Sequence, residues 1–159
     1  MLPNTPSILD ELIRGLSDEE LGRKPARERF SVGEVIAHLE HAERTLYGPR
    51  LRAMFEADRP ALPAYKAPAS GFAGRDTRTT LESYAREREA NSKLLSAVEP
   101  EDLGRTGTHE FYGPLTLENI ISEIAYHDLG HIKQICELVR WLRFHPKMGP
   151  FRKDYQVHP

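Results

Sequence analysis

The 159-residue sequence lacks the features that mark several large classes of protein. Its single cysteine, Cys136, excludes an internal disulfide and cysteine-rich zinc sites, so any metal must bind to histidine or carboxylate side chains. No apolar run approaches the roughly 18–20 residues that cross a bilayer. The first residues also lack the basic-then-apolar pattern of a signal peptide. We therefore expect a cytoplasmic protein that does not interact with membranes.

The sequence also has no excess of charge of one sign. Its formal net charge is −2, and the 22 Lys and Arg residues are dispersed among 24 Asp and Glu residues, so no basic patch is available to bind nucleic acid. Apolar residues make up 39% and charged residues 29%, which is ordinary for a globular protein of one domain. We expect residues 1–159 to form that domain.

The spacing of apolar residues predicts an all-α fold, a four-helix bundle. Four helices are expected near residues 6–16, 32–57, 77–98 and 117–143. The first is expected to be capped by Thr5 and the last by Thr116, whereas Ser31 and Glu34 fit a capping box that starts the second. Gly48 and Pro49 should kink or break the second helix.

The segments between these helices are less regular. The longest loop, residues 59–75, is rich in Pro, Ala and Gly and is expected to cover one end of the bundle. Residues 104–115 are expected to form a short irregular segment or hairpin rather than a sheet. We expect one short helical turn at residues 18–21, a solvated middle of the third helix at residues 86–89, and a C-terminal tail at residues 143–159.

Two histidines interrupt the apolar stripe of the last helix. The stripe runs Ile120, Ile124, His127, His131 and Ile135, with spacings of four, three, four and four, so both imidazoles should face inward. Residues four apart on a helix have Cβ atoms about 5–6 Å apart, which lets two imidazoles reach one metal ion at about 2.0–2.1 Å. A single inward histidine is more often a hydrogen-bonded core residue. Two that face each other need a shared partner to offset desolvation, and a metal ion supplies it.

A third ligand is expected from the second helix, which contains His38 and His41. His38 lies on the apolar line with Val35 and Ala42, whereas His41 lies on a more polar line. We predict that His38 completes the site, with His41 as the alternative.

No catalytic residue is assigned by these patterns, but Glu123 and Glu34 are weak candidates. Glu123 precedes His127 by four residues, so it could accept an imidazole N–H or act as a base. Glu34, Asp128 and Tyr126 also lie within about a turn of a ligand. For all four, a solvated or helix-pairing side chain is the simpler interpretation, and Cys136 is expected to be a small core residue.

An HD-type phosphohydrolase is a second enzyme class suggested by the adjacent pair His127 and Asp128. That site needs a further upstream histidine and downstream aspartate. The inward stripe selects His127 with His131 rather than with Asp128.

Two segments together resemble the DinB/YfiT-like superfamily: SVGEVIAHLEHAE near the start, and TLENIISEIAYHDLGHIKQI much later in the chain. The resemblance extends from about Phe30, where the family often has Trp, to Leu142. It implies a four-helix bundle, often dimeric, with a metal triad that falls here on His38, His127 and His131. It also implies Zn²⁺, Ni²⁺ or a similar ion and a small-molecule substrate, since relatives include thiol S-transferases that use bacillithiol or mycothiol, and maleylpyruvate isomerases.

Three protein ligands would leave a coordination position open, as in catalytic metal sites. A water bound there could become a hydroxide for hydrolysis, whereas a low-molecular-weight thiol could become a nucleophile for transfer. The sequence therefore favours a metal-dependent enzyme, either a thiol S-transferase or a hydrolase. The alternative is a non-catalytic helical bundle or stress-response module that the metal only stabilises.

Overall fold

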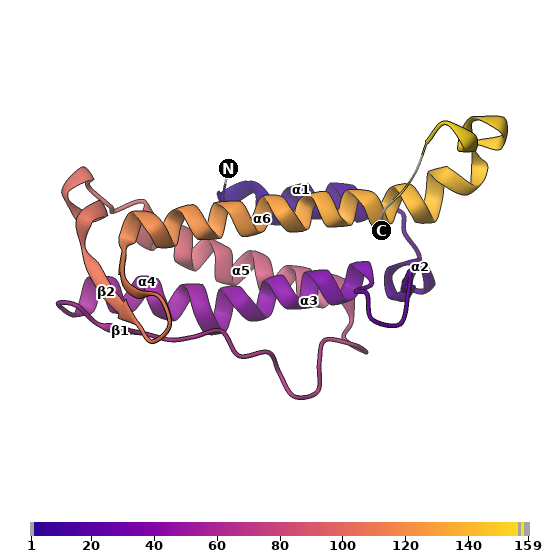
Figure 1. The fold of residues 1–159 in the computed structure, drawn as a ribbon. Helices are drawn as coiled ribbons and strands as arrows, with labels where there is room; N and C mark the ends of the chain where they lie inside the picture. The colour runs from indigo at the N-terminus through magenta and orange to yellow at the C-terminus, as the bar shows by residue number, and fades with distance from the viewer. Residues whose placement is uncertain (1, 156, 158–159) are drawn as a thin grey trace.

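The computed structural model describes residues 2–155 and 157. Its α-helices are α1 (Thr5–Ile13), α2 (Asp18–Gly22), α3 (Val32–Ala42), α4 (Gly48–Glu56), α5 (Thr77–Leu95) and α6 (Leu117–Val139). Four rods, formed by α1, by α3 with α4, by α5 and by α6, lie side by side, and α2 lies at one end (Figure 1). The predicted all-α four-helix bundle is confirmed.

A small sheet lies at the opposite end of the bundle from α2 (Figure 1). Its strands are β1 (Ala61–Leu62), β2 (Thr106–His109) and β3 (Gly113–Thr116), in the order β1-β2-β3. The hairpin of β2 and β3 agrees with the expectation for residues 104–115, but β1 adds a third, parallel strand from the long loop. The expectation of no sheet there is therefore wrong, because the backbone of residues 61–62 finds hydrogen-bonding partners on β2.

The helix starts follow the predicted capping in two cases out of three. The Ser31 hydroxyl accepts a hydrogen bond from the Glu34 amide at 3.2 Å, and the Glu34 carboxylate accepts one from the Ser31 amide at 2.9 Å. Thr116 caps α6 in the same reciprocal way with Asn119. Thr5 does not cap α1 as predicted, because it lies inside the helix and its buried hydroxyl donates to Asp128 Oδ2 at 2.7 Å.

Replacing Ser31 with alanine is expected to destabilise the protein by about 1 kcal/mol, because the Glu34 amide loses its capping oxygen. Urea denaturation would measure this loss. The matched control is Ser122→Ala on the exposed face of α6, which should change stability by less than about 0.5 kcal/mol. Equal effects of the two substitutions would show that the cap contributes nothing.

The second rod stays helical where a kink or break was predicted. A π-helical turn, Glu43–Tyr47, joins α3 to α4, and Pro49 lies in the first turn of α4. Pro49 has no N–H to continue the α-helical ladder, and the wider π turn carries the chain past it without ending the rod. A second π turn, Arg140–Phe144, prolongs α6. Beyond it the tail forms short 3₁₀ turns, and residues 156, 158 and 159 of the predicted tail lie outside the described residues.

The core consists of two apolar clusters separated along the bundle. On α6, Ile135 belongs to the cluster near α2 and Ile124 belongs to the cluster near the sheet. Between them lies a set of hydrogen-bonded buried side chains, here called the polar layer. Its members are Thr5, Glu43, Tyr84, Arg88, Asn91 and Asp128. Arg88 is only 2% exposed, so the predicted solvated middle of α5 is wrong at this position.

Among the described residues, no helix combines the length and the apolar character needed to span a bilayer.

Candidate metal centre

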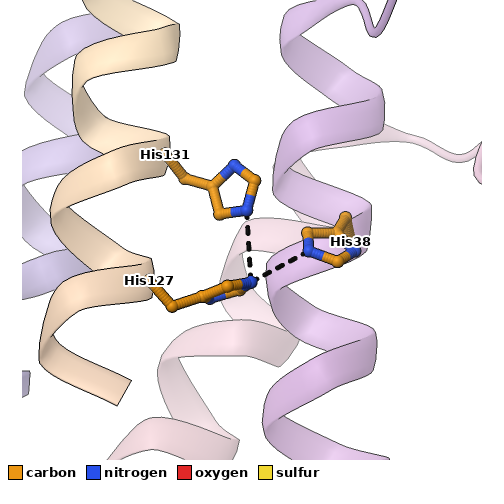
Figure 2. A group of neighbouring side chains, drawn as sticks. All are labelled: His38, His127 and His131. Atoms are coloured by element: carbon orange, nitrogen blue, oxygen red, sulfur yellow. Dashed lines mark hydrogen bonds between the residues drawn. The ribbon is translucent and has the colours of Figure 1, made fainter. Parts of the chain in front are cut away.

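Three histidine side chains converge between α3 and α6 (Figure 2). His127 Nε2 lies 3.0 Å from His38 Nε2 and 3.2 Å from His131 Nε2. Each residue offers one ligand atom, and these atoms all lie within 4.8 Å of one another. All three side chains are half-buried. The structure thus brings together the three histidines that the sequence analysis selected, from helices far apart in the chain.

His127 Nε2 lies at the separation expected of ligands around one ion from each of the other two Nε2 atoms. Nitrogens about 2.0–2.1 Å from a common metal, at angles of about 90–110°, lie about 2.9–3.4 Å from each other. The two short distances measured here fall within that range. The residues present therefore fit a divalent transition metal that accepts imidazole ligands.

The imidazoles are also in the protonation state that a metal requires. Burial, followed by the neighbouring His131 and His127, lowers the pKa of His38 to about 3. Burial and His131 lower the pKa of His127 to about 4, and burial lowers the pKa of His131 as well. At neutral pH all three rings are uncharged, so no proton has to leave before a metal binds.

In two of the three histidines, the ring nitrogen that faces away from the cluster, Nδ1, has a hydrogen-bond partner. His131 Nδ1–H donates to Gln134 Oε1 at 2.9 Å, which leaves the Nε2 lone pair directed at the cluster. His38 Nδ1 lies 3.0 Å from the Tyr65 hydroxyl, whose oxygen can accept a hydrogen bond from Nδ1–H. His127 differs, because its buried Nδ1 has no hydrogen-bond partner among the described residues. Instead, the ring of Tyr47 packs edge-on against it, with centroids 5.6 Å apart.

His41, the alternative third ligand, lies outside the cluster. Its Nε2–H donates to the Lys66 carbonyl at 2.9 Å and so ties the long loop to α3. The rings of Tyr65 and Phe72, from the same loop, pack against both His38 and His41. This loop runs along the second rod rather than only covering one end of the bundle (Figure 1).

The four candidate helper residues have other partners or face solvent. The Glu123 carboxylate pairs with buried Arg50 at 3.0 Å, so it does not accept an N–H from His127. Glu34 caps α3 and pairs with Lys24. Tyr126 is 82% exposed. Asp128 belongs to the buried polar layer and points away from the histidines. This agrees with the inward stripe, which selected His131 rather than Asp128 as the partner of His127 and so disfavoured an HD-type site.

The sequence analysis gave no role to several residues that contact the histidines. Gln134 follows His131 by three residues, and this spacing could have indicated its hydrogen bond. Tyr65 lies in a loop without periodicity and Tyr47 in a π turn, so no sequence pattern pointed to either. Cys136 is half-buried, and burial raises the pKa of its thiol.

Comparison with known proteins places this arrangement in a family. Residues 1–135 match the DinB superfamily. The chain belongs to the DinB superfamily.

Two individual proteins are similar to this chain over most of its length. An uncharacterised Bacillus subtilis protein, YuaE, is 26% identical over 144 residues, which cover 79% of this chain and 87% of YuaE. A protein of Oceanobacillus iheyensis named "Putative metal-dependent hydrolase OB0413" is 21% identical over 131 residues, which cover 80% of this chain and 75% of that protein.

The fold of this DinB-superfamily chain also matches a solved structure. YfiT from Bacillus subtilis superposes with a TM-score of 0.77 at 20% identity, covering 88% of this chain and 82% of YfiT. That protein is described as a probable metal-dependent hydrolase with an unusual four-helix bundle topology. At this identity the likeness establishes the fold.

Proposed function

We propose that this DinB-superfamily chain is a metal-dependent hydrolase in which His38, His127 and His131 hold one divalent transition metal ion. The convergence of three Nε2 atoms from α3 and α6 carries the proposal. The name of the Oceanobacillus iheyensis relative and the description of YfiT, both of which refer to a metal-dependent hydrolase, support it.

The ligand set favours a catalytic role over a purely structural one. Three protein ligands leave a position for water, whose pKa an ion such as Zn²⁺ can lower to about 7 so that it supplies a hydroxide. The three imidazoles are neutral, so they do not reduce the positive charge that polarises a substrate oxygen. Imidazole suits Zn²⁺ and Ni²⁺, the two ions that we propose first.

Two side chains of this protein hold the ligands ready for the ion. Gln134 Oε1 accepts from His131 Nδ1–H, which fixes the tautomer that presents Nε2 to the cluster. The Tyr65 hydroxyl hydrogen-bonds His38 Nδ1 and so orients that ring. Because Tyr65 belongs to the long loop, the position of that loop and the orientation of His38 depend on each other.

The test combines metal analysis with activity measurements on the intact protein. Elemental analysis of purified protein should find about one transition metal ion per chain, and the metal-loaded protein should hydrolyse ester or amide substrates at a rate that a chelator abolishes. Bacillithiol, mycothiol and glutathione, each offered with monochlorobimane, form a separate set of assays. Metal-dependent activity only with a thiol would replace hydrolysis by thiol transfer. Bound metal without any activity would indicate a metal-stabilised module, and the absence of metal binding would refute the site.

Metal binding is also expected to stabilise the fold, because the two helices that carry the ligands must be folded together to bind it. At a free Zn²⁺ concentration 100-fold above the dissociation constant, the free energy of unfolding should rise by about 2.7 kcal/mol. For a chain of this size the melting temperature should then rise by about 5–11 °C. Differential scanning calorimetry with Zn²⁺ and with chelator would measure the change. A melting temperature that is identical in both conditions would contradict the prediction.

A further inference from the structure

His127 is the one ligand whose Nδ1 is not held by a hydrogen bond among the described residues. His38 and His131 each have a side-chain partner at Nδ1, whereas His127 Nδ1 has none among the described residues. Yet His127 lies at the centre of the cluster, within 3.2 Å of both other ligand nitrogens. On its Nδ1 side, the ring is therefore held by its backbone position and by packing.

The polar layer reaches His127 from one side through its chain neighbour. Asp128 is 1% exposed, and both of its carboxylate oxygens are hydrogen-bonded. Oδ1 accepts from Arg88 Nη2 at 3.0 Å, and Oδ2 accepts from the Thr5 hydroxyl at 2.7 Å. These bonds tie α6 to α5 and α1, and they fix how α6 is rotated about its own axis. That rotation decides whether His127 and His131 face His38.

The polar layer reaches His127 from the other side through the π turn. Arg88 Nη2 also donates to Glu43 Oε2 at 2.7 Å, and the amide of Asn91 donates to Glu43 Oε1 at 2.8 Å. Glu43 begins the π turn that ends at Tyr47, whose ring packs against His127. The guanidinium of Arg88 thus bridges Asp128, which is next to His127 in the chain, and the π turn. That turn carries Tyr47, whose ring packs against His127.

We propose that Arg88, through Asp128 and Glu43, is the positioning residue that holds His127 in the geometry needed for metal binding. This inference rests on the proposed metal site. Apolar packing alone is less specific, since hydrophobic cores can lose a unique packing arrangement before they lose stability. A guanidinium directs its N–H donors in one plane, so it can bind two carboxylates only when the helices that carry them are in one relative arrangement.

The experiment is a titration of the metal-free protein with Co²⁺, followed by visible absorption. The band intensities report the ligand geometry, and the midpoint reports the affinity. Arg88→Lys keeps the positive charge but loses the planar set of N–H donors. Asp128→Asn keeps the shape of the side chain but loses its negative charge. Each variant should bind Co²⁺ about 10–100-fold more weakly than the unaltered protein, with altered band intensities.

The matched control is Leu21→Ala, which removes a side chain that is 2% exposed on α2, outside the polar layer. It should lower thermal stability without changing the Co²⁺ affinity or spectrum. If the single variants fail to fold, the charge-free variant Glu43→Gln/Arg88→Met/Asp128→Leu replaces them, since apolar residues of similar size often preserve the stability of a buried ionic site. It should be folded and still bind Co²⁺ weakly.

Three outcomes separate the possibilities. Weaker binding in the polar-layer variants together with unchanged binding in Leu21→Ala supports positioning by Arg88. Folded polar-layer variants that bind Co²⁺ with the affinity and spectrum of the unaltered protein overturn the inference and leave the metal site intact. Failure of the unaltered protein to bind Co²⁺ or Zn²⁺ refutes the proposed function and, with it, this inference.

Discussion

Replacing His131 with alanine is expected to weaken Zn²⁺ binding by about 100-fold or more. A four-ligand zinc site releases about 10–16 kcal/mol on binding, so one ligand contributes on the order of 2.5–4 kcal/mol. Each 1.4 kcal/mol corresponds to about tenfold in affinity. The remaining two imidazoles, His38 and His127, still face each other but no longer define a three-coordinate site. Competition with a chromophoric chelator would measure the affinity.

His41→Ala is the matched control for this substitution. His41 is a half-buried histidine on the same helix as His38, but it binds the Lys66 carbonyl rather than the cluster. Its loss should leave the Zn²⁺ affinity within a few-fold of the original. If His41→Ala weakened binding as much as His131→Ala, the assignment of ligands would be wrong.

Replacing Arg88 with methionine is expected to cost about 3–5 kcal/mol of folding free energy. Arg88 is 2% exposed, and its guanidinium donates to both Asp128 and Glu43. Without it, two buried carboxylates lose the cation that compensates for their desolvation. Urea denaturation at neutral pH would measure the loss, and calorimetry should show a melting temperature lower by about 6–20 °C for a chain of this size.

Two further variants show whether this cost arises from the ion pairs. Arg86→Met changes an exposed arginine on the same helix and should alter stability by less than about 0.5 kcal/mol. Combining Arg88→Met with Glu43→Gln and Asp128→Leu removes the stranded carboxylates and should recover most of the loss. A large cost that persists in the triple variant would instead point to lost packing of the arginine side chain.

Local patterns were enough to predict most of the fold and the three histidines. The capping box of Ser31 and Glu34 marks the start of α3 because both hydrogen bonds join residues close in sequence. The i,i+4 spacing of His127 and His131 places both rings on one helix face whatever surrounds the helix. His38 could be preferred to His41 because the apolar line of α3 faces the core.

Pairings between distant segments could not be predicted in this way. Glu123 has the right spacing to reach His127, but its carboxylate pairs with Arg50, which is far away in the sequence. Arg88 lies in a run of alternating charges that is typical of an exposed helix surface. Its burial is explained by the ion pairs that it forms with Asp128 and Glu43, which lie on other rods. The parallel pairing of β1 with β2 likewise depends on residues brought together by the bundle.

The π turn between α3 and α4 makes the number of residues in this rod part of the folding information. Successive residues of an α-helix are rotated by about 100°, and a π turn takes up about one residue more than an α turn. Winding Glu43–Tyr47 as regular α-helix, with no residue deleted, would therefore swing all of α4 by about that angle. Leu51 and Met54 would then leave the core, and Arg50 would turn away from Glu123. The phase of α4 relative to His38 therefore depends on the π winding of Glu43–Tyr47 as well as on the number of residues in the rod.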